Sequence, residues 1–233
     1  MSLPTPRRLV RLHLTLGLLV VFALAGCGDD DDPIAPTDTK FVLRVQQGYQ
    51  PTSAYDGCRY VQISPSSQDG GNSTAYVGVL NGEESRVLTA FYGLQNLLPP
   101  DVAIERAFVQ WTLNGQAGSE VRVQAFALSE NWNGNATWSQ RFQSQTDNPW
   151  ATPGGAYDPT VLDEVEVEDG DSQFVIELPP ALVENWIREW RTNRGIILIA
   201  PEVTPGSVSS QAVPLRSPLS GGLAPVLTLV YSL

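Results

Sequence analysis

The chain has 233 residues, with 14 lysines and arginines, 25 aspartates and glutamates and one histidine, which gives a formal net charge of −11 at pH 7. The histidine and three of the arginines lie within residues 1–26. Without that segment, 11 basic residues remain against 25 acidic ones, so the formal charge is −14 and histidine is absent. Nucleic acid is therefore not an expected partner, because binding to phosphates depends on clustered Lys and Arg. Because residues 27–233 contain no histidine, Ser-His-Asp catalysis, Cys-His catalysis and His-ligated zinc are excluded as well.

Residues 1–26 have the three zones of a bacterial export signal. Three arginines within the first eleven residues precede an almost wholly apolar run over 12–23. Leu24-Ala25-Gly26-Cys27 then matches the lipobox of bacterial lipoproteins, in which a peptidase cuts before the cysteine. The alternative is a retained membrane helix, but such a helix needs about 20 apolar residues. We therefore expect residues 1–26 to be a lipoprotein signal peptide that is removed.

Cys27 is the expected site of lipidation, because its thiol accepts a diacylglyceryl group. Each buried CH₂ stabilises membrane binding by about 0.8 kcal/mol, so two or more acyl chains make a stable anchor. Gly28 follows the cysteine instead of aspartate, so the inner-membrane retention signal of enterobacterial lipoproteins is absent. We expect a protein attached by lipid to the cell envelope, at the outer membrane in preference to the inner one. Its exposure to the periplasm or to the cell surface stays open.

Residues 27–40 are expected to form the lipidated cysteine and an acidic disordered tether. The segment 28–39 holds five aspartates, two prolines and no aromatic residue, so it buries too little apolar surface to offset its ordering entropy. A calcium site in the aspartate run is the alternative, although consecutive like charges without a turn-forming scaffold make poor ligands. With Cys27 committed to lipid, Cys58 has no internal disulfide partner. We expect Cys58 to be a small buried apolar side chain and not a reactive thiol.

Residues 41–233 show the pattern of one all-β domain. Short runs of β-forming residues alternate with clusters of Gly, Pro, Asn and Asp, and Asn81-Gly82 is the strongest hairpin signal. Strands are expected over 41–45, 60–63, 76–80, 86–92, 104–113, 121–128, 161–168, 174–178, 195–199 and 226–231. One amphipathic helix is expected over 180–191, where the apolar residues form a single stripe. About ten short strands with one short helix predict an antiparallel β-sandwich.

Several short motifs occur in order along this domain. They include Tyr76-Val77-Gly78, Arg86-Val87-Leu88-Thr89-Ala90-Phe91, Asn135-Ala136-Thr137-Trp138, Pro149-Trp150-Ala151-Thr152-Pro153-Gly154-Gly155 and Asn193-Arg194-Gly195-Ile196-Ile197-Leu198. On these motifs the chain from about residue 55 onward resembles the DNRLRE-type domains, which are jelly-roll modules related to the carbohydrate-binding modules of polysaccharide-degrading bacteria. The motif that gives the family its name is not present as such. The resemblance implies a jelly-roll fold and a surface role, and it leaves the ligand open.

Residues 129–160 have no sustained period and are rich in Asn, Ser, Gly, Pro and Trp, as expected of a long structured loop across one end of the domain. Within this loop Trp132 and Trp150 are the best candidates for exposed rings that stack on a sugar, with Asn133, Asn148 and Tyr157 beside them. The remaining tryptophans are assigned to the interior. Trp111 lies on the apolar face of its strand, Trp186 and Trp190 lie on the helical stripe, and Trp138 is expected to close the end of the sandwich.

Two further kinds of site use carboxylates. Asp147, Asp158 and Asp163 border the loop and are candidate ligands for a structural calcium ion, with ion pairing or solvation as the alternative. No cofactor is required. Glycoside hydrolysis by paired carboxylates needs no histidine, but Glu164, Glu166 and Glu168 alternate with valines and so fall on the solvent face of a strand. The chain is therefore not expected to be an enzyme.

The leading hypothesis from the sequence is a non-catalytic lipoprotein of the cell envelope whose β-sandwich binds polysaccharide or another glycan. The first alternative is a structural or adhesive scaffold that docks onto a protein partner in the envelope. The second is a hydrolase that degrades glycans with paired carboxylates.

Overall fold

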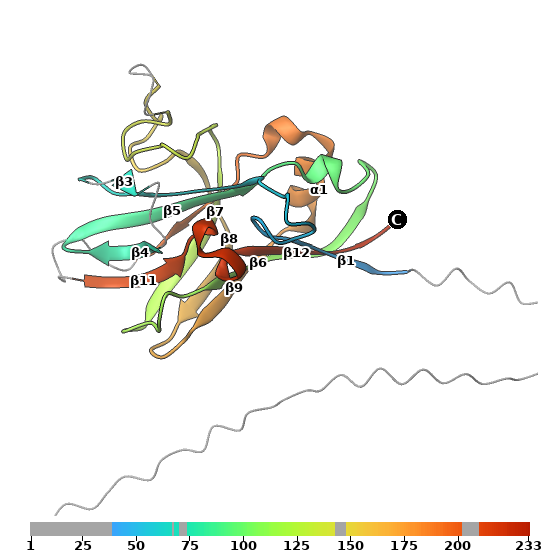
Figure 1. The fold of residues 1–233 in the computed structure, drawn as a ribbon. Helices are drawn as coiled ribbons and strands as arrows, with labels where there is room; N and C mark the ends of the chain where they lie inside the picture. The colour runs from blue at the N-terminus through green and yellow to red at the C-terminus, as the bar shows by residue number, and fades with distance from the viewer. Residues whose placement is uncertain (1–38, 67, 70–73, 143–147, 202–209) are drawn as a thin grey trace, which may run out of the picture. The chain divides into compact units, whose positions relative to one another are not determined.

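The computed structural model describes residues 39–66, 68–69, 74–142, 148–201 and 210–233. In this part of the chain twelve strands and one α-helix form a β-sandwich of antiparallel sheets (Figure 1). The predicted all-β sandwich with one helix is therefore confirmed. The predicted signal peptide and most of the tether lie outside the described residues, and within the described residues no helix is long and apolar enough to cross a membrane.

The smaller sheet has four strands in the order β1-β12-β6-β9. They are β1 (Phe41–Val45), β12 (Val226–Ser232), β6 (Ala103–Thr112) and β9 (Gln173–Leu178). Its register aligns Leu43, Leu229, Ala107 and Leu178 in one row across the sheet. Because side chains alternate between the faces of a strand, a row of this kind gives the sheet one apolar face.

The larger sheet follows the order β11-β4-β5-β10-β7-β8, and β2 also pairs with β5. Its strands are β11 (Ser210–Arg216), β4 (Thr74–Leu80), β5 (Glu83–Phe91), β10 (Ile196–Ile199), β7 (Val121–Leu128), β8 (Tyr157–Val167), β2 (Cys58–Ile63) and the two-residue β3 (Gln68–Asp69). β11 was not predicted because Pro214 interrupts its pattern. The strand lies at an edge of the sheet, where a residue without an N–H is tolerated.

An inner core fills the space between the two sheets. It contains Trp111 from β6 and Ile176 from β9 on one side, and Val123 from β7 and Leu198 from β10 on the other. Trp111 is fully buried, as predicted from its place on the strand. The helix α1 (Pro180–Arg188) adds buried apolar side chains to this core and packs beside β6.

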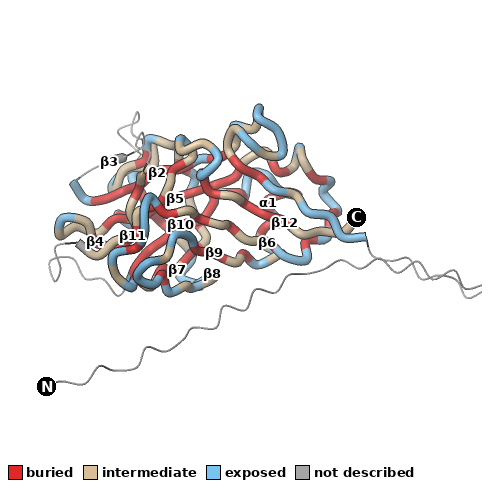
Figure 2. Tube along the Cα trace, turned by 60° about the horizontal axis from the view of Figure 1, so that its bottom comes forward, coloured by how far each residue is buried: buried red, intermediate tan, exposed pale blue. Residues whose placement is uncertain are grey.

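An outer core covers the opposite face of the larger sheet. There the segments 129–142 and 148–156 of the loop pack against β2, β5, β7 and β10, and they contribute Trp132, Ala136, Trp150 and Ala156. Ile197 and Ile199 face this outer core, whereas Ile196 and Leu198 face the inner one. Figure 2 accordingly shows β5 and β10 in the buried part of the molecule. The predicted loop exists, but it ends earlier than expected, because β8 begins at Tyr157, and it covers a sheet face in addition to an end of the domain.

Gly195 precedes β10 at the point where two strands approach most closely. Its φ is +77°, a region that L side chains rarely adopt, and a Cβ there would lie 2.1 Å from the carbonyl oxygen of Thr89. Since that oxygen belongs to the backbone of β5, it cannot move aside without disturbing the sheet.

We predict that Gly195→Ala lowers the free energy of unfolding by about 2–4 kcal/mol, because backbone strain and overpacking each cost about 1–3 kcal/mol. The measurement is urea denaturation followed by tryptophan fluorescence. Gly118→Ala is the matched control, since a Cβ at Gly118 meets nothing within 4 Å, and it should change stability by less than about 1 kcal/mol. Equal midpoints for the two variants would contradict the prediction.

Candidate ligand-binding site

The two tryptophans predicted to be exposed on the loop are buried. Trp132 is 5% exposed and its Nε1–H donates to the carbonyl oxygen of Arg194 at 2.7 Å. Trp150 is 4% exposed and its Nε1–H donates to the carbonyl oxygen of Thr137 at 2.9 Å. The predicted exposure of both rings is therefore wrong. The physical reason is that the outer face of the larger sheet is apolar, and the loop covers it with these two indoles.

The other residues proposed beside them do not complete an exposed platform. The ring of Tyr157 lies against Phe126, with centroids 4.8 Å apart, and is half-buried. The side-chain oxygen of Asn133 accepts a hydrogen bond from the backbone of Asn135, and the Asn148 backbone accepts one from Arg141. Trp138, half-buried, packs on the outer core beneath the guanidinium of Arg86, 4.8 Å from its ring.

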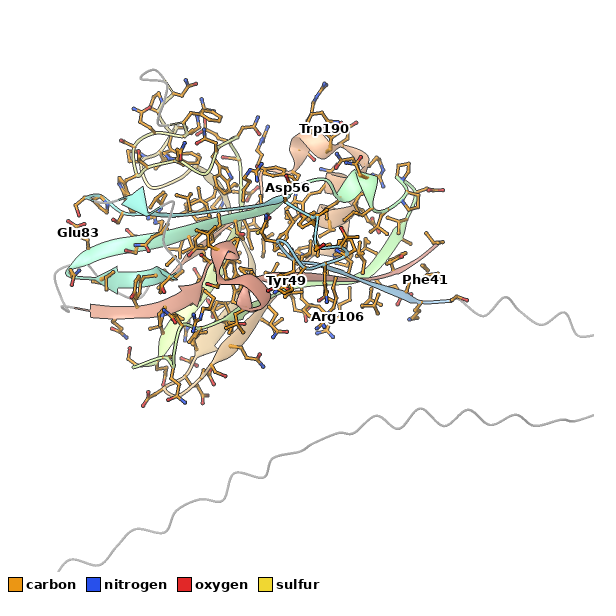
Figure 3. The ribbon with its side chains drawn as sticks, viewed as in Figure 1. Phe41, Tyr49, Asp56, Glu83, Arg106 and Trp190 are labelled. Atoms are coloured by element: carbon orange, nitrogen blue, oxygen red, sulfur yellow. The ribbon has the colours of Figure 1, made fainter. Side chains whose placement is uncertain are left out.

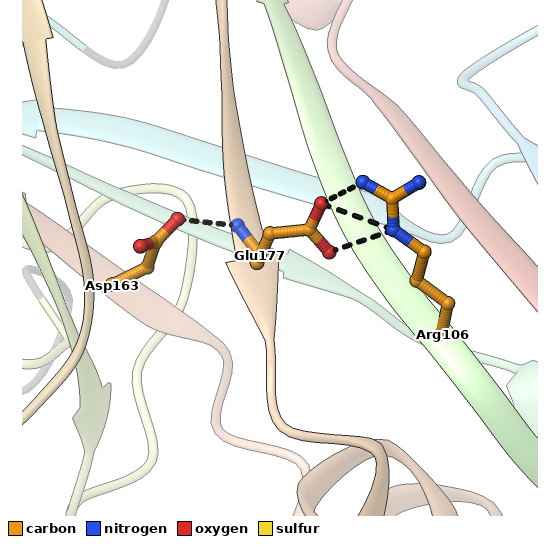
Figure 4. Close-up of polar contacts among 3 residues, drawn as sticks. All are labelled: Arg106, Asp163 and Glu177. Atoms are coloured by element: carbon orange, nitrogen blue, oxygen red, sulfur yellow. Dashed lines mark hydrogen bonds and ion pairs between the residues drawn. The ribbon is translucent and has the colours of Figure 1, made fainter.

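The acidic residues proposed for calcium are engaged with the chain itself. Asp158 accepts from the backbone N–H of Thr160 at 2.8 Å, and this bond lowers the pKa of its carboxyl group. Asp163 accepts from the backbone N–H of Glu177 at 2.7 Å, and Glu177 pairs in turn with Arg106 (Figure 4). This chain of contacts joins β8 of the larger sheet to β9 and β6 of the smaller one. Asp147 lies outside the described residues.

Metal-ligand side chains do not gather elsewhere in the described residues either, where no group of three or more His, Cys, Asp or Glu side chains could hold a metal ion.

Trp190 is the large aromatic side chain that the sequence placed wrongly in the interior. The helix stops at Arg188 because Glu189 has φ −121° and ψ 67°, and Trp190 begins a 3₁₀ turn over Trp190–Thr192. The helical period therefore does not extend to Trp190, whose side chain is 54% exposed. Figure 3 shows it projecting away from the ribbon. Trp186, one turn earlier, is buried as predicted.

Trp190 lines a hollow of about 400 Å³ whose other walls come from the residue after β5, from the loop and from the 3₁₀ turn with the residue after it. The lining residues are Tyr92, Asn131, Trp132, Trp190, Arg191 and Asn193. The guanidinium of Arg191 lies 5.1 Å from the centre of the Trp190 ring, so it covers part of that indole. We refer to this site as the Trp190 hollow.

Two lining residues hold the Trp190 hollow in shape. Asn193 is buried, its Nδ2 donates to the carbonyl oxygen of Phe91 at 2.7 Å, and its Oδ1 accepts from the backbone of Gly195. These bonds fix the 3₁₀ turn against the end of β5. Trp132 does the same for the loop through its bond to Arg194. The two residues are structural parts of the wall.

Two other lining residues carry polar groups that the protein does not use. In the part of the chain that the structure describes, the Tyr92 hydroxyl and the Asn131 side-chain amide have no hydrogen-bond partner. Burial raises the pKa of Tyr92, so its hydroxyl stays protonated at neutral pH and can donate. The hollow thus combines an exposed indole with a free hydroxyl and a free amide. Sequence reasoning missed Tyr92 because it ends an apolar strand and was assigned to that strand.

Cys58 lines a separate hollow of about 160 Å³ beside Tyr60 and Ser217. Its side chain is buried, as predicted, and the low-dielectric surroundings raise the pKa of the thiol to about 12 from 9.0, against a smaller opposing effect of Thr89. A thiol in that state is a poor nucleophile at neutral pH.

The raised pKa of Cys58 predicts a loss of stability in alkali. Below pH 9 the thiol is neutral in both states; between about 9 and 12 the unfolded chain loses the proton while the folded chain keeps it. The free energy of unfolding should therefore fall as pH rises through this window. Urea denaturation at pH 8 and pH 10 measures the effect, and Cys58→Ala should fall less steeply. Parallel curves for the two proteins would argue against it.

Comparisons with known proteins identify no family for the chain. No family model matches it, and no curated protein sequence matches it. Among solved structures, a chain described as "KBV activated particle at acidic pH" is similar at 12% identity and a TM-score of 0.27, with 98% of this chain and 90% of that chain covered. The resemblance to DNRLRE-type domains stays a prediction from the sequence motifs.

Proposed function

We propose that this protein is a lipid-anchored lipoprotein of the bacterial cell envelope whose β-sandwich binds polysaccharide, without catalysis, at the Trp190 hollow. The observation that carries the proposal is the side chain of Trp190, 54% exposed at the edge of a hollow that also presents a hydroxyl and an amide with no hydrogen-bond partner among the described residues. The surface exposes few other large aromatic rings; among the described residues they are Phe41 and Tyr49.

The chemistry of a sugar fits this combination of groups. A pyranose ring has an apolar C–H face that packs on an indole, and its edge carries hydroxyls that both donate and accept hydrogen bonds. Trp190 supplies the apolar surface, the Tyr92 hydroxyl supplies a donor or acceptor, and the Asn131 amide supplies both. Arg191 adds donors at the rim. Three of these four side chains come from the residue after β5 and from the 3₁₀ turn, and Asn193 holds these two segments together through its bond to Phe91.

We propose binding without catalysis because the acidic side chains are poorly placed for glycoside hydrolysis. That reaction needs a carboxylic acid with a raised pKa beside a second carboxylate in a cleft. Glu164 and Glu166 lie exposed on β8. Glu120 has a raised pKa because its carboxyl group hydrogen-bonds with that of Glu166, but it is fully solvent-exposed. Neither Glu120 nor Glu166 lines the Trp190 hollow.

The anchor is tested by removing its thiol. We predict that Cys27→Ala moves the protein from the detergent-rich phase to the aqueous phase after Triton X-114 partitioning, because two or more acyl chains are needed for stable attachment. Cys58→Ala is the matched control and should stay with the detergent, since Cys58 is the other cysteine of the chain and is buried. If the Cys27→Ala variant partitioned into the detergent-rich phase as the Cys58→Ala variant does, lipidation at Cys27 would be refuted.

The binding site is tested by contrasting two tryptophans. We predict that Trp190→Ala weakens polysaccharide binding about tenfold, the equivalent of about 1.4 kcal/mol, while stability changes by less than about 0.5 kcal/mol. Trp132→Ala should instead lower the free energy of unfolding by about 3–5 kcal/mol, because it leaves a cavity in the outer core. Affinity electrophoresis through gels containing neutral or anionic polysaccharides measures binding, and urea denaturation measures stability.

Phe41→Ala is the control for a nonspecific aromatic effect, since Phe41 lies on β1 and is exposed. It should migrate like the unmodified protein in every gel. Failure of the unmodified protein to be retarded by any polysaccharide would sink the proposed function, and so would equal retardation of the Trp190→Ala variant.

A further inference from the structure

A second hollow of about 380 Å³ is also lined by Tyr92. Its walls include Tyr55, Asp56, Arg59, Tyr92 and Asn96. Tyr92 lines both this hollow and the Trp190 hollow, so the two depressions are neighbours that share one residue. We refer to the second one as the Asp56 hollow. Figure 3 labels Asp56 and Trp190, which mark the two.

The wall between the hollows is fixed by the backbone. The backbone N–H of Tyr92 donates to the carbonyl oxygen of Gly57 at 2.9 Å, and the Tyr55 hydroxyl donates to the carbonyl oxygen of Tyr92 at 2.9 Å. A Cβ at Gly57 would lie 2.3 Å from that same carbonyl oxygen, so only glycine permits this approach. The segment that carries Asp56 is therefore held directly against the residue shared by both hollows, and their spacing is set before a ligand binds.

The Asp56 hollow presents polar groups of both kinds. Asp56 and Asn96 are exposed, and among the described residues neither side chain has a hydrogen-bond partner. Arg59 donates one Nη1–H to the backbone oxygen of Asp56 at 3.0 Å, which leaves its remaining N–H groups for a ligand. A carboxylate, an amide and a guanidinium together can accept from and donate to the hydroxyls of a sugar. The half-buried ring of Tyr55 also lines this hollow and gives it an apolar surface beside the polar groups.

We propose that the Asp56 hollow is a second subsite of the same groove, and that the ligand is a linear polysaccharide held along several consecutive sugars of its chain. This inference rests on the proposed function. Each hollow alone is near the lower end of the volumes typical of ligand sites, and the two share Tyr92 as a lining residue, so one extended ligand could occupy both. Tyr92 is the residue that both hollows share, so consecutive sugars would pass it on the way from one hollow to the other.

The test uses oligosaccharides of increasing length, prepared from whichever polysaccharide retards the full chain in gels, with affinity measured by isothermal titration calorimetry. Affinity should rise with length until the oligosaccharide spans both hollows and should then level off. The double variant Asp56→Ala/Asn96→Ala should lose roughly five- to tenfold in affinity for long oligosaccharides and less than about twofold for the shortest that bind. Trp190→Ala should lose affinity at every length.

Both substituted side chains are exposed, so the double variant should keep the unfolding midpoint of the unmodified protein, and urea denaturation checks this. Tyr92→Phe, which removes only the hydroxyl, is a second variant. It should lower the affinity for long and intermediate oligosaccharides more than the affinity for the shortest ones. An equal loss at all lengths, or affinity that is already maximal for a disaccharide, would overturn the second subsite while the proposed function stood. Absence of binding by the unmodified protein to any polysaccharide would remove both.

Discussion

The structure depends on the burial of both faces of the central strands of the larger sheet. Ile196 and Leu198 of β10 point into the inner core, and Ile197 and Ile199 point the other way. The same division holds for β5, where Val87 and Phe91 face inward and Leu88 and Ala90 face outward. A second sheet covers one of these faces. The other would expose a contiguous apolar patch to water, and the loop segments 129–142 and 148–156 prevent this with two indoles.

That requirement fixes the position of the candidate site. Once the loop packs on the outer face, the Nε1–H of Trp132 reaches the backbone of Arg194, and Asn193 next to it bonds the end of β5. Asn131 precedes Trp132 and Tyr92 follows Phe91, so the groups offered to a ligand sit one residue from groups that hold the fold. The site is preorganised by packing that is present without a ligand, which reduces the conformational entropy lost on binding.

Much of the fold could be predicted from the sequence because strand alternation and turn residues are local signals. The positions of most strands and the start of the helix at Pro180 follow from such signals, whereas β3, β11 and the first residues of β8 do not. The end of the helix could not be predicted in this way. Trp190 stands at a position that continues the apolar stripe of the helix, and the stripe does not reveal that the chain leaves the helical conformation at Glu189. Trp132 and Trp150 were misplaced for a different reason: their burial depends on a distant sheet face. The run Ile196 to Ile199, apolar at every position, was the available signal that something must cover a second face.

The tryptophans of this domain therefore differ in whether the protein itself buries the ring and accepts a hydrogen bond from the indole N–H. Trp132 and Trp150 have both satisfied within the protein, by the outer core and by backbone carbonyls. Trp190 has about half its surface in water, and the guanidinium of Arg191 lies 5.1 Å from the centre of its ring. An indole whose surface the fold does not bury gains free energy by covering that surface with something else. Since Trp190 adds little to the sandwich, its affinity for a ligand can change without a cost in stability, whereas a ring in the outer core cannot take on that role without uncovering the sheet.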